Sequence, residues 1–223
     1  MRVLIACERS GIVREAFRRL GHDAWSCDLE PAEDNGHHFT ADALEVAYEL
    51  DGWDLMIAHP ECRYLSVSGL HWNHRRPERA ALTEQAAEFA LALWNAPITR
   101  VALENPVGIL SSRIRKPDQI IQPYQFGEDA SKATCLWLRN LRTLRPTQRV
   151  AGRIVNGKER WANQTDSGQN RLGPSPTRSM DRARTYQGIA DAMSRQWGSP
   201  ESSWQTVSTE VGQVEIPLEQ ARA

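Results

Sequence analysis

The stretch that decides the fold is DLMIAHPECRYLSVSG, residues 54–69. Four apolar residues follow Asp54, and Gly52 and Pro60 bound the run on either side. A short apolar run of this kind predicts a fully buried strand of a parallel sheet. Open α/β sheets bind ligands in the crevice at the carboxyl ends of their strands. Cys62, which follows the run directly, is therefore expected where a substrate would bind.

Strand and helix patterns alternate on both sides of this stretch. Alternation of this kind predicts an α/β fold with a mostly parallel, Rossmann-like sheet. The expected strands cover residues 3–7, 24–27, 54–58, 100–103 and 132–138, and the expected helices cover residues 12–20, 78–94 and 186–198.

The turn after the first strand carries candidate cofactor-binding residues. In a nucleotide-binding βαβ unit this turn approaches the ligand, and an acidic residue at the end of the second strand bonds the ribose hydroxyls. Here the turn contains Glu8, Ser10 and Gly11, and the second strand ends at Asp28. These four residues are the predicted cofactor contacts from this unit.

The composition predicts one globular domain without a metal centre. The chain has 223 residues, of which 40% are hydrophobic, and no apolar run approaches the roughly 18 residues of a membrane span. We therefore expect a cytoplasmic protein. The four cysteines show no Cys-x-x-Cys spacing, which argues against a disulfide framework and a cysteine zinc site. The adjacent His37 and His38 are expected to be loop residues rather than metal ligands.

Charge is unevenly distributed along the chain. Residues 111–195 contain 16 Lys and Arg against 7 Asp and Glu, whereas the remaining residues contain 11 against 21. This asymmetry favours contact between the second half and phosphate groups. Arg142, Arg145 and Arg149 are the candidate contacts, and a solvated arginine-rich surface is the alternative interpretation.

Two side chains at the expected carboxyl edge of the sheet are candidates for catalysis. Cys62 can act as a nucleophile if a neighbouring cation or base favours its thiolate, and Arg63 and His59 are close in sequence. The alternative for a lone cysteine is a small buried hydrophobic residue. Glu104 begins the sequence Glu-Asn-Pro after the next strand, so it lies at the same edge as Cys62 and suits acid catalysis.

These motifs resemble the signatures of the DNA cytosine-5 methyltransferases, short phage and prophage members in particular. The catalytic loop of that family usually reads Pro-Pro-Cys-Gln-x-x-Ser-x-x-Gly, and Cys62, Ser66 and Gly69 match its fixed positions. Glu-Asn-Pro resembles the family's second signature, and its distance from the cysteine is also similar. The resemblance covers nearly all of residues 1–198.

The resemblance implies methyl transfer from S-adenosylmethionine to carbon 5 of a cytosine, with DNA as the expected substrate. Cys62 would add to carbon 6, and Glu104 would protonate ring nitrogen 3. Tyr64, Trp72, Arg75 and Arg76 are candidates to replace the stacking of a flipped base. The host would be a bacterium or a phage-infected cell. The implied cofactor contacts are Glu8, Ser10, Gly11, Asp28, Asp42 and Pro60, and the implied substrate contacts are Arg63, Ser66, Asn105 and Lys132.

The sequence departs from the family at three points. Only Gly11 remains of the usual Phe-x-Gly-x-Gly turn, and Glu61 replaces the second proline, where a carboxylate would raise the pKa of the neighbouring thiol unless it turns away. The family's paired arginines are missing beside Lys132. Arg113, Arg115 or Arg178 could substitute for them.

The recognition region is short, which leaves other functions open. Residues 139–180 form a loop-rich basic insert, whereas sequence-specific methyltransferases often carry about a hundred residues there. One alternative is modification of carbon 5 in a free pyrimidine nucleotide. Another is a DNA-binding or antirestriction relative without catalysis. We expect a methyltransferase domain over residues 1–198 and a flexible tail over residues 199–223.

Overall fold

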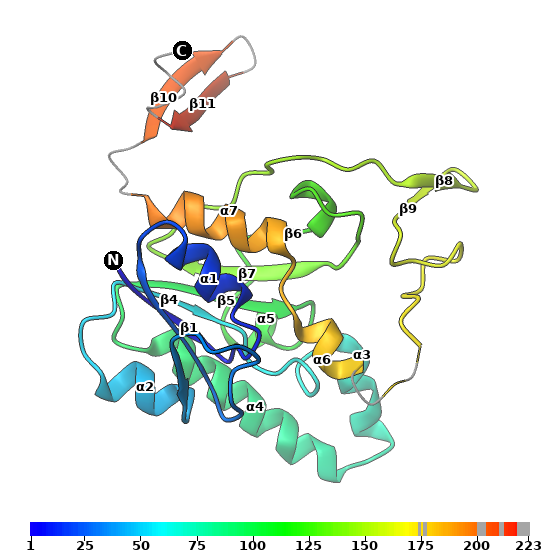
Figure 1. Ribbon diagram of the computed structural model, residues 1–223. Helices are drawn as coiled ribbons and strands as arrows, with labels where there is room; N and C mark the ends of the chain where they lie inside the picture. Colours follow the sequence, from blue (N-terminus) through cyan, green and yellow to red (C-terminus); the bar gives the residue numbers. More distant parts are fainter. Residues whose placement is uncertain (174, 176–177, 200–203, 210–211, 218–223) are drawn as a thin grey trace.

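The computed structural model describes residues 1–173, 175, 178–199, 204–209 and 212–217. Strands and helices alternate along much of the chain (Figure 1). The strands are β1 (Arg2–Ala6), β2 (Asp23–Asp28), β3 (His38–Thr40), β4 (Leu55–Ala58), β5 (Arg100–Pro106), β6 (Gln119–Ile121), β7 (Thr134–Arg139), β8 (Arg153–Val155), β9 (Lys158–Arg160), β10 (Trp204–Thr209) and β11 (Gly212–Pro217). The helices are α1 (Ile12–Arg18), α2 (Ala43–Glu49), α3 (Val67–Leu70), α4 (Glu78–Asn95), α5 (Leu110–Arg113), α6 (Arg178–Ala183) and α7 (Gln187–Gly198), with short 3-10 turns at His71–His74 and Pro123–Gln125.

Seven strands form the central sheet in the order β3-β2-β1-β4-β5-β7-β6. β7 runs antiparallel to both of its neighbours, and the other strands are parallel. The expected fold class, α/β with a mostly parallel, Rossmann-like sheet, is confirmed. Ala58 pairs with Ala6 on β1 and with Leu103 on β5, so the carboxyl ends of these three strands meet at one edge.

Alternate side chains of the buried strands enter two separate cores, as the pleat of a sheet requires. Val3 and Ile5 pack with α1 and α7 on one face, whereas Leu4 and Met56 pack with α2 and α4 on the other. Figure 1 shows these two helix pairs above and below the sheet. Both faces are covered, which explains why the central strands β1 and β4 contain continuous apolar runs.

Contacts with α7, the last of the described helices, position the segment that follows β7. The Trp197 indole donates to the carbonyl oxygen of Arg142 at 2.9 Å, and Arg100, at the start of β5, donates to the carbonyl oxygen of Trp197 at 2.6 Å. Arg139, at the end of β7, pairs with Val101. Residues 139–145 therefore lie at the amino edge of the parallel strands, opposite to Cys62.

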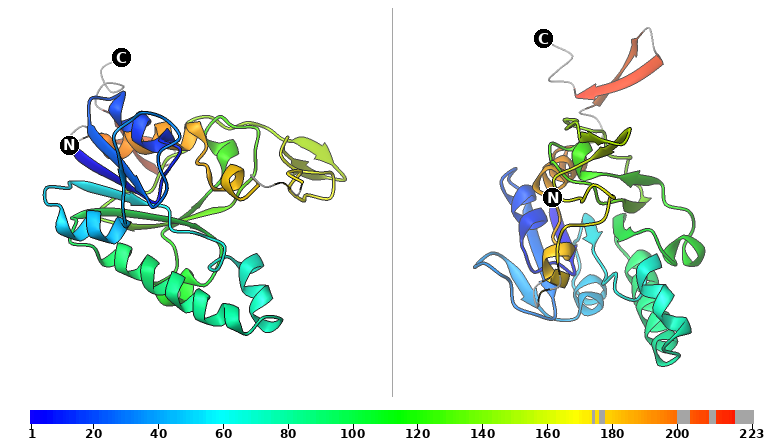
Figure 2. Two further views of the ribbon diagram at one scale, coloured as in Figure 1. Left: turned by 60° about the horizontal axis from the view of Figure 1, so that its bottom comes forward. Right: turned by 90° about the vertical axis from the view of Figure 1, so that its right-hand side faces the viewer.

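The predicted loop-rich insert contains little regular structure beyond the β8–β9 hairpin, which projects away from the sheet (Figure 2). Tyr124 stacks on Trp161 with ring centroids 4.0 Å apart, and this contact attaches the insert to the domain. Within the predicted tail, β10 and β11 pair with each other in an antiparallel hairpin. None of the described helices has the length and apolar character needed to cross a bilayer.

Candidate active site

Cys62 lies in a tight turn directly after β4. Its carbonyl oxygen accepts hydrogen bonds from the amides of Leu65 at 3.2 Å and Ser66 at 3.0 Å. The Ser66 hydroxyl in turn accepts from the Gly69 amide at 3.3 Å and caps α3. A Cβ at Gly69 would collide with the carbonyl oxygen of Arg63, so this position requires glycine. Ser66, a predicted substrate contact, and Gly69 thus shape the loop that presents Cys62.

Asn105 ties this loop to β5. Its Nδ2 donates to the carbonyl oxygen of Pro60 at 2.8 Å, and the residue is 1% exposed. Pro60 is buried as well. Asn105 was predicted to bind substrate and Pro60 to bind cofactor, and the structure gives them a shared role in joining the two motifs.

Glu104 lies at the end of β5 among groups that favour its carboxylate. Nδ1 of His59 is 3.2 Å from Oε2 of Glu104, and Lys132 and Thr134 also act on the carboxyl group. Burial has the largest influence and favours the neutral acid, but His59, Lys132 and Thr134 together lower the pKa of Glu104 below its ordinary value. Glu104 is therefore a carboxylate at neutral pH.

The pKa of the Cys62 thiol is shifted in the opposite direction, above its ordinary value. Cys62 is exposed at the surface, yet partial desolvation by its neighbours, followed by the negative charge of Glu104, raises the pKa of its thiol, while Lys132 and Arg182 act to lower it. Glu104 is thus the carboxylate that acts most on the nucleophile. Glu61, which replaces the family's second proline, is exposed. The thiol is protonated at neutral pH, so its proton has to move before the sulfur can attack.

A cavity of about 110 Å³ opens at the carboxyl ends of β1, β2 and β4. Its walls come from the turn after β1, from the loop after β2, from His59 and from the segment between α6 and α7. The lining residues are Cys7, Glu8, Arg9, Ser10, Asp28, Glu33, His59, Ala183, Arg184 and Thr185. Three predicted cofactor residues, Glu8, Ser10 and Asp28, are among them. The ion pair between Arg184 and Glu33 joins two of the walls.

Glu8 caps helix α1 from within the cavity wall. Its carboxylate accepts from the amides of Val13 at 2.8 Å and Arg14 at 3.2 Å, and from the Ser10 hydroxyl at 3.3 Å. Burial nevertheless raises the pKa of Glu8 above its ordinary value, although the His59 charge and the two amides act to lower it. The carboxyl group that the sequence assigns to the cofactor is also a structural part of the turn.

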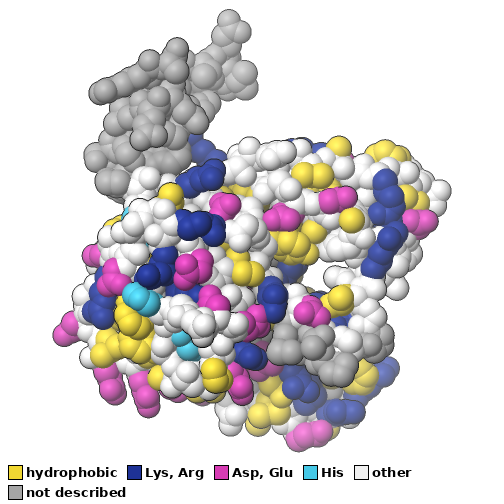
Figure 3. Space-filling model, viewed as in Figure 1, with side chains coloured by type: hydrophobic (Ala, Val, Ile, Leu, Met, Phe, Trp, Pro, Cys, Tyr) yellow, Lys and Arg dark blue, Asp and Glu magenta, His cyan; other side chains and the backbone are white. Residues whose placement is uncertain are grey.

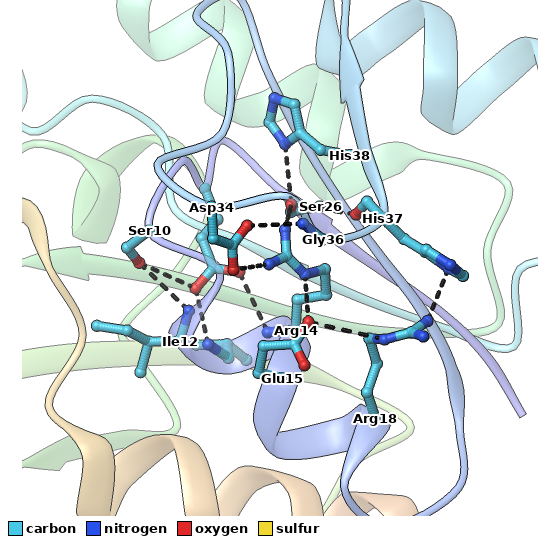
Figure 4. A network of polar contacts seen from close by, with 12 residues as sticks. Ser10, Ile12, Arg14, Glu15, Arg18, Ser26, Asp34, Gly36, His37 and His38 are labelled. Carbon is cyan, nitrogen blue, oxygen red and sulfur yellow. Dashed lines mark hydrogen bonds and ion pairs between the residues drawn. The ribbon is translucent and has the colours of Figure 1, made fainter.

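Gly11 makes room for a buried arginine. Arg14 is fully buried and bonds Ser26 at 2.8 Å, Glu15 at 2.9 Å and Asp34 (Figure 4). Gly11 has a positive φ of 69°, and a Cβ there would collide with the Arg14 guanidinium. The network holds the loop that carries Glu33 against the start of α1. The single glycine of this turn therefore serves the Arg14 network.

The two predicted cofactor aspartates lie in different environments. Asp28 lines the cavity, and its carboxylate accepts from the Glu30 amide at 3.0 Å. Asp42 is not a lining residue but caps α2 by accepting from the Leu44 amide at 2.8 Å. The charges of both aspartates reach Cys7, whose thiol pKa is raised chiefly by burial. Asp28 is thus the better placed of the two for a ligand in this cavity.

An arginine-rich and aromatic surface, residues 63–79, adjoins Cys62. Arg79 lies over the Tyr64 ring at 4.7 Å, and Arg75 and Arg76 lie 5.6 and 5.8 Å from the Trp72 ring. Trp72 is 44% exposed. Figure 3 shows basic side chains gathered at the lower right of the molecule, the region of α3 and the start of α4 in Figure 1.

The arginine whose charge acts on Cys62 was not anticipated. Arg113 and Arg115, two predicted substitutes for the family's paired arginines, pair instead with Glu84 and Asp118. After Lys132, the positive charge that acts on Cys62 is that of Arg182, whose carbonyl oxygen accepts from the Lys132 ammonium at 2.8 Å. Arg182 lies on α6, far from Lys132 and Cys62 in the sequence. Its distance along the chain therefore gave no sign that it would act on Cys62.

The structure places two of the three predicted phosphate contacts away from Cys62 and pairs the third with a carboxylate. Arg142 and Arg145 lie beside the carboxyl-terminal end of α7, at the amino edge of the sheet, so a base at Cys62 is out of their reach. Arg149 is paired with Glu159 at 2.7 Å. Internal ion pairs therefore neutralise part of the positive charge of the insert.

His37 and His38 contact neighbouring side chains and backbone. His37 Nδ1 is 2.7 Å from an Arg18 nitrogen, and His38 contacts Ser26 at 2.9 Å and the Glu30 carbonyl oxygen at 3.0 Å. Over the described part of the chain, no cluster of three or more His, Cys, Asp or Glu could hold a metal ion. The side chain of His74, a possible partner of His71, lies outside the described residues.

No protein-family model and no curated protein matches this sequence. Among solved structures, the chain is similar to a protein encoded within an E. coli prophage and assigned as a DNA modification methyltransferase, with a TM-score of 0.42 and 13% sequence identity. The similarity covers 62% of this chain and 46% of that chain, so this chain matches less than half of its neighbour's length.

Proposed function

We propose that the protein is an S-adenosylmethionine-dependent methyltransferase that acts on carbon 5 of cytosine in DNA. The observation that carries the proposal is the meeting of Cys62 and Glu104 at neighbouring strand ends, close enough for their charges to interact. A nucleophile and an acid at one edge are what addition to a pyrimidine ring requires.

The cavity beside this edge suits the cofactor chemically. Its three acids, Glu8, Asp28 and Glu33, outnumber the two arginines of the lining, and within the described part of the chain Asp28 is not in an ion pair with either, so a carboxylate remains to complement the positive charge of a sulfonium or an ammonium group. Asp28, at the end of β2, is positioned to bond ribose hydroxyls. S-adenosylmethionine would supply the methyl group when bound.

The chain's own residues would carry out the remaining chemistry. The Cys62 thiol gives its proton to solvent and the sulfur bonds to carbon 6, which moves electron density onto carbon 5 while ring nitrogen 3 takes a proton delivered through Glu104. After carbon 5 has gained its methyl group, a base removes the carbon-5 proton and the carbon–sulfur bond breaks. Lys132 and Arg182 would stabilise the thiolate at the start and at the end of this sequence.

The surface of residues 63–79 would contact the DNA. Its arginines can bind backbone phosphates, and Tyr64 and Trp72 offer aromatic faces that can replace the stacking lost when a base is flipped out. A free pyrimidine nucleotide is the second candidate substrate, because the ion pairs Arg149–Glu159 and Arg153–Asp166 occupy part of the insert's positive charge.

The test is incubation with tritiated S-adenosylmethionine and, in parallel, duplex DNA, single-stranded DNA, RNA and free pyrimidine nucleotides. The proposal expects label in 5-methylcytosine of DNA. Faster labelling of cytidine nucleotides at equal base concentration would favour the second candidate. No label in any pyrimidine, together with retained cofactor binding, would favour a relative without catalysis.

A further inference from the structure

His59 lies between the catalytic edge and the cavity. Its backbone amide donates to the carbonyl oxygen of Ala6 at 2.9 Å, which extends the β1–β4 ladder by one residue. Its Nδ1 is 3.2 Å from Oε2 of Glu104, and the same residue lines the cavity. The His59 side chain is 9% exposed. One buried imidazole thus touches both Glu104 and the predicted cofactor site.

The second ring nitrogen of His59 lacks a partner. Nε2 is buried and forms no hydrogen bond within the described part of the chain. Buried polar atoms in proteins are almost always hydrogen-bonded, and the exceptions often belong to catalytic or ligand-binding groups. A ligand or a water molecule in the cavity could therefore exchange a proton with Nε2.

Charged groups surround the ring on several sides. Glu104 accepts from Nδ1 on the β5 side, because an ionised carboxylate is an acceptor only. Glu8, in the turn after β1, acts on His59 through its charge. Lys132 acts on the same Glu104 carboxylate from the approach to β7. The other titratable or charged residues of the cavity wall are Cys7, Arg9, Asp28, Glu33 and Arg184.

The proposed reaction poses a specific difficulty at Glu104. Ring nitrogen 3 needs a proton when Cys62 adds to carbon 6, yet Glu104 is held as a carboxylate. A carboxylate cannot donate a proton that it does not carry. The hydrogen-bonded donor beside it is Nδ1 of His59.

We infer that His59 supplies the proton which Glu104 delivers to ring nitrogen 3 of the pyrimidine. His59 is a positioning residue, since it acts on the substrate only through Glu104, and the inference rests on the proposed function. During addition, one proton passes from Nδ1 to Glu104 as one passes from Glu104 to nitrogen 3, and the imidazolium becomes neutral. When the carbon–sulfur bond breaks, the proton returns by the same path. The Cys62 thiol proton goes to solvent before addition and is regained from solvent after the carbon–sulfur bond breaks, and the carbon-5 proton leaves to a solvent base, so the protons balance.

The catalytic test uses His59→Asn, which keeps an N–H donor toward Glu104 but cannot ionise. Single-turnover methylation of duplex DNA is measured against pH. At neutral pH the variant should be about 100- to 1,000-fold slower than the wild type, in the range for general acid catalysis. Its rate should then rise about tenfold per unit of falling pH, because Glu104 must take its proton from solvent. A loss of constant size at every pH would overturn the inference and indicate a purely structural role. The control His37→Asn, in an exposed loop, should follow the wild-type profile.

A second measurement does not depend on methylation. The ring NMR signals of His59, identified by their loss in His59→Asn, are followed against pH in the wild type and in Glu104→Gln. Removal of the hydrogen-bonded anion should move their transition to lower pH. An unchanged transition would overturn the inference. If the wild type methylates no substrate, the proposed function fails, whereas this titration still decides whether His59 and Glu104 share a proton.

Discussion

Nδ2 of Asn105 donates a hydrogen bond to the carbonyl oxygen of Pro60, with 2.8 Å between the two atoms. This bond joins the end of β5 to the loop that carries Cys62. Glu104 precedes Asn105 directly, so the bond fixes the acid relative to the nucleophile across two strand ends. The bond is buried with Asn105, which shields it from competition with water.

Loss of this bond should slow catalysis more than it weakens cofactor binding. Asn105→Ala leaves the Pro60 carbonyl buried without a donor, and we expect a loss of about 1–3 kcal/mol in the free energy of unfolding. Misplacement of Cys62 should reduce the single-turnover rate about 100-fold. The control is Gln196→Ala, which removes a hydrogen bond from the side-chain amide of Gln196 to the Arg145 carbonyl oxygen at the opposite edge of the sheet. Equal rates for Asn105→Ala and the control would contradict the positioning role.

Glu104→Gln should change two reactivities in opposite directions. Methyl transfer should fall by about two to four orders of magnitude with the loss of the acid. Alkylation of Cys62 by iodoacetamide should become faster, because Glu104 is, after burial, the main cause of the raised thiol pKa. Peptide mass spectrometry gives the alkylation rate at Cys62 alone. Lys132→Met serves as the converse variant and should slow alkylation, since it removes a charge that lowers the same pKa. Slower alkylation in Glu104→Gln would contradict the electrostatic account.

Arg14 should be the main stabiliser of the loop over the cavity. Arg14→Met should reduce the free energy of unfolding by about 3 kcal/mol, the low end for breaking a buried ion pair, because Asp34 is 42% exposed. Arg18→Met removes a more exposed cation from the same helix and should cost less than about 1 kcal/mol. Denaturant titrations measure both variants.

The effect of Arg14 should also depend on pH. Burial acts to raise the pKa of Asp34, but the bonds from Arg14 and the Gly36 amide lower it overall. The folded protein thus gains stability from ionised Asp34 above its unfolded pKa of about 3.9, and loses it as the pH falls through the lower, folded value. The stability difference between the wild type and Arg14→Met should therefore shrink below about pH 4. A difference that stays constant down to lower pH would argue against this ion pair.

Salt dependence of duplex binding should locate the DNA surface. The affinity should fall with salt with a log–log slope of about −3 to −5, at about −0.9 for each neutralised phosphate. Replacing both Arg75 and Arg76 by Gln should flatten the slope by about 1.8 units. The matched pair Arg142→Gln and Arg145→Gln, at the amino edge, should leave it unchanged. A slope near zero in the wild type would favour the free nucleotide as substrate.

Much of the fold follows from the sequence because apolar runs and their boundaries are local signals. The strand at residues 54–58 and the helix at 78–94 were expected within a residue or two of β4 and α4. The antiparallel direction of β7 was not expected, since direction depends on the length and path of the preceding loops. The short β3 and α2 were missed because segments of three to seven residues carry too weak a periodicity.

The candidate site was predictable only where its residues follow strand ends. Cys62 and Glu104 meet as expected, because strand order places their strands side by side. The sequence suggested His59 as a partner of Cys62, but the structure shows its Nδ1 beside the Glu104 carboxylate. The direction of the His59 ring could not be predicted from the sequence. The position of Arg142 and Arg145 at the amino edge was not predictable, because a charge count carries no information about which edge of the sheet a loop occupies.

The most direct test of the account is covalent capture of Cys62. Duplex DNA with 5-fluorocytosine is incubated with the protein and S-adenosylmethionine, and intact mass is measured. Fluorine cannot leave carbon 5 as a proton does, so the wild type should accumulate a methylated DNA adduct at Cys62, and Cys62→Ser should form none. Methylation of ordinary cytosine by Cys62→Ser, or turnover by the wild type without any adduct on the fluorinated duplex, would contradict the assignment of Cys62 as the nucleophile.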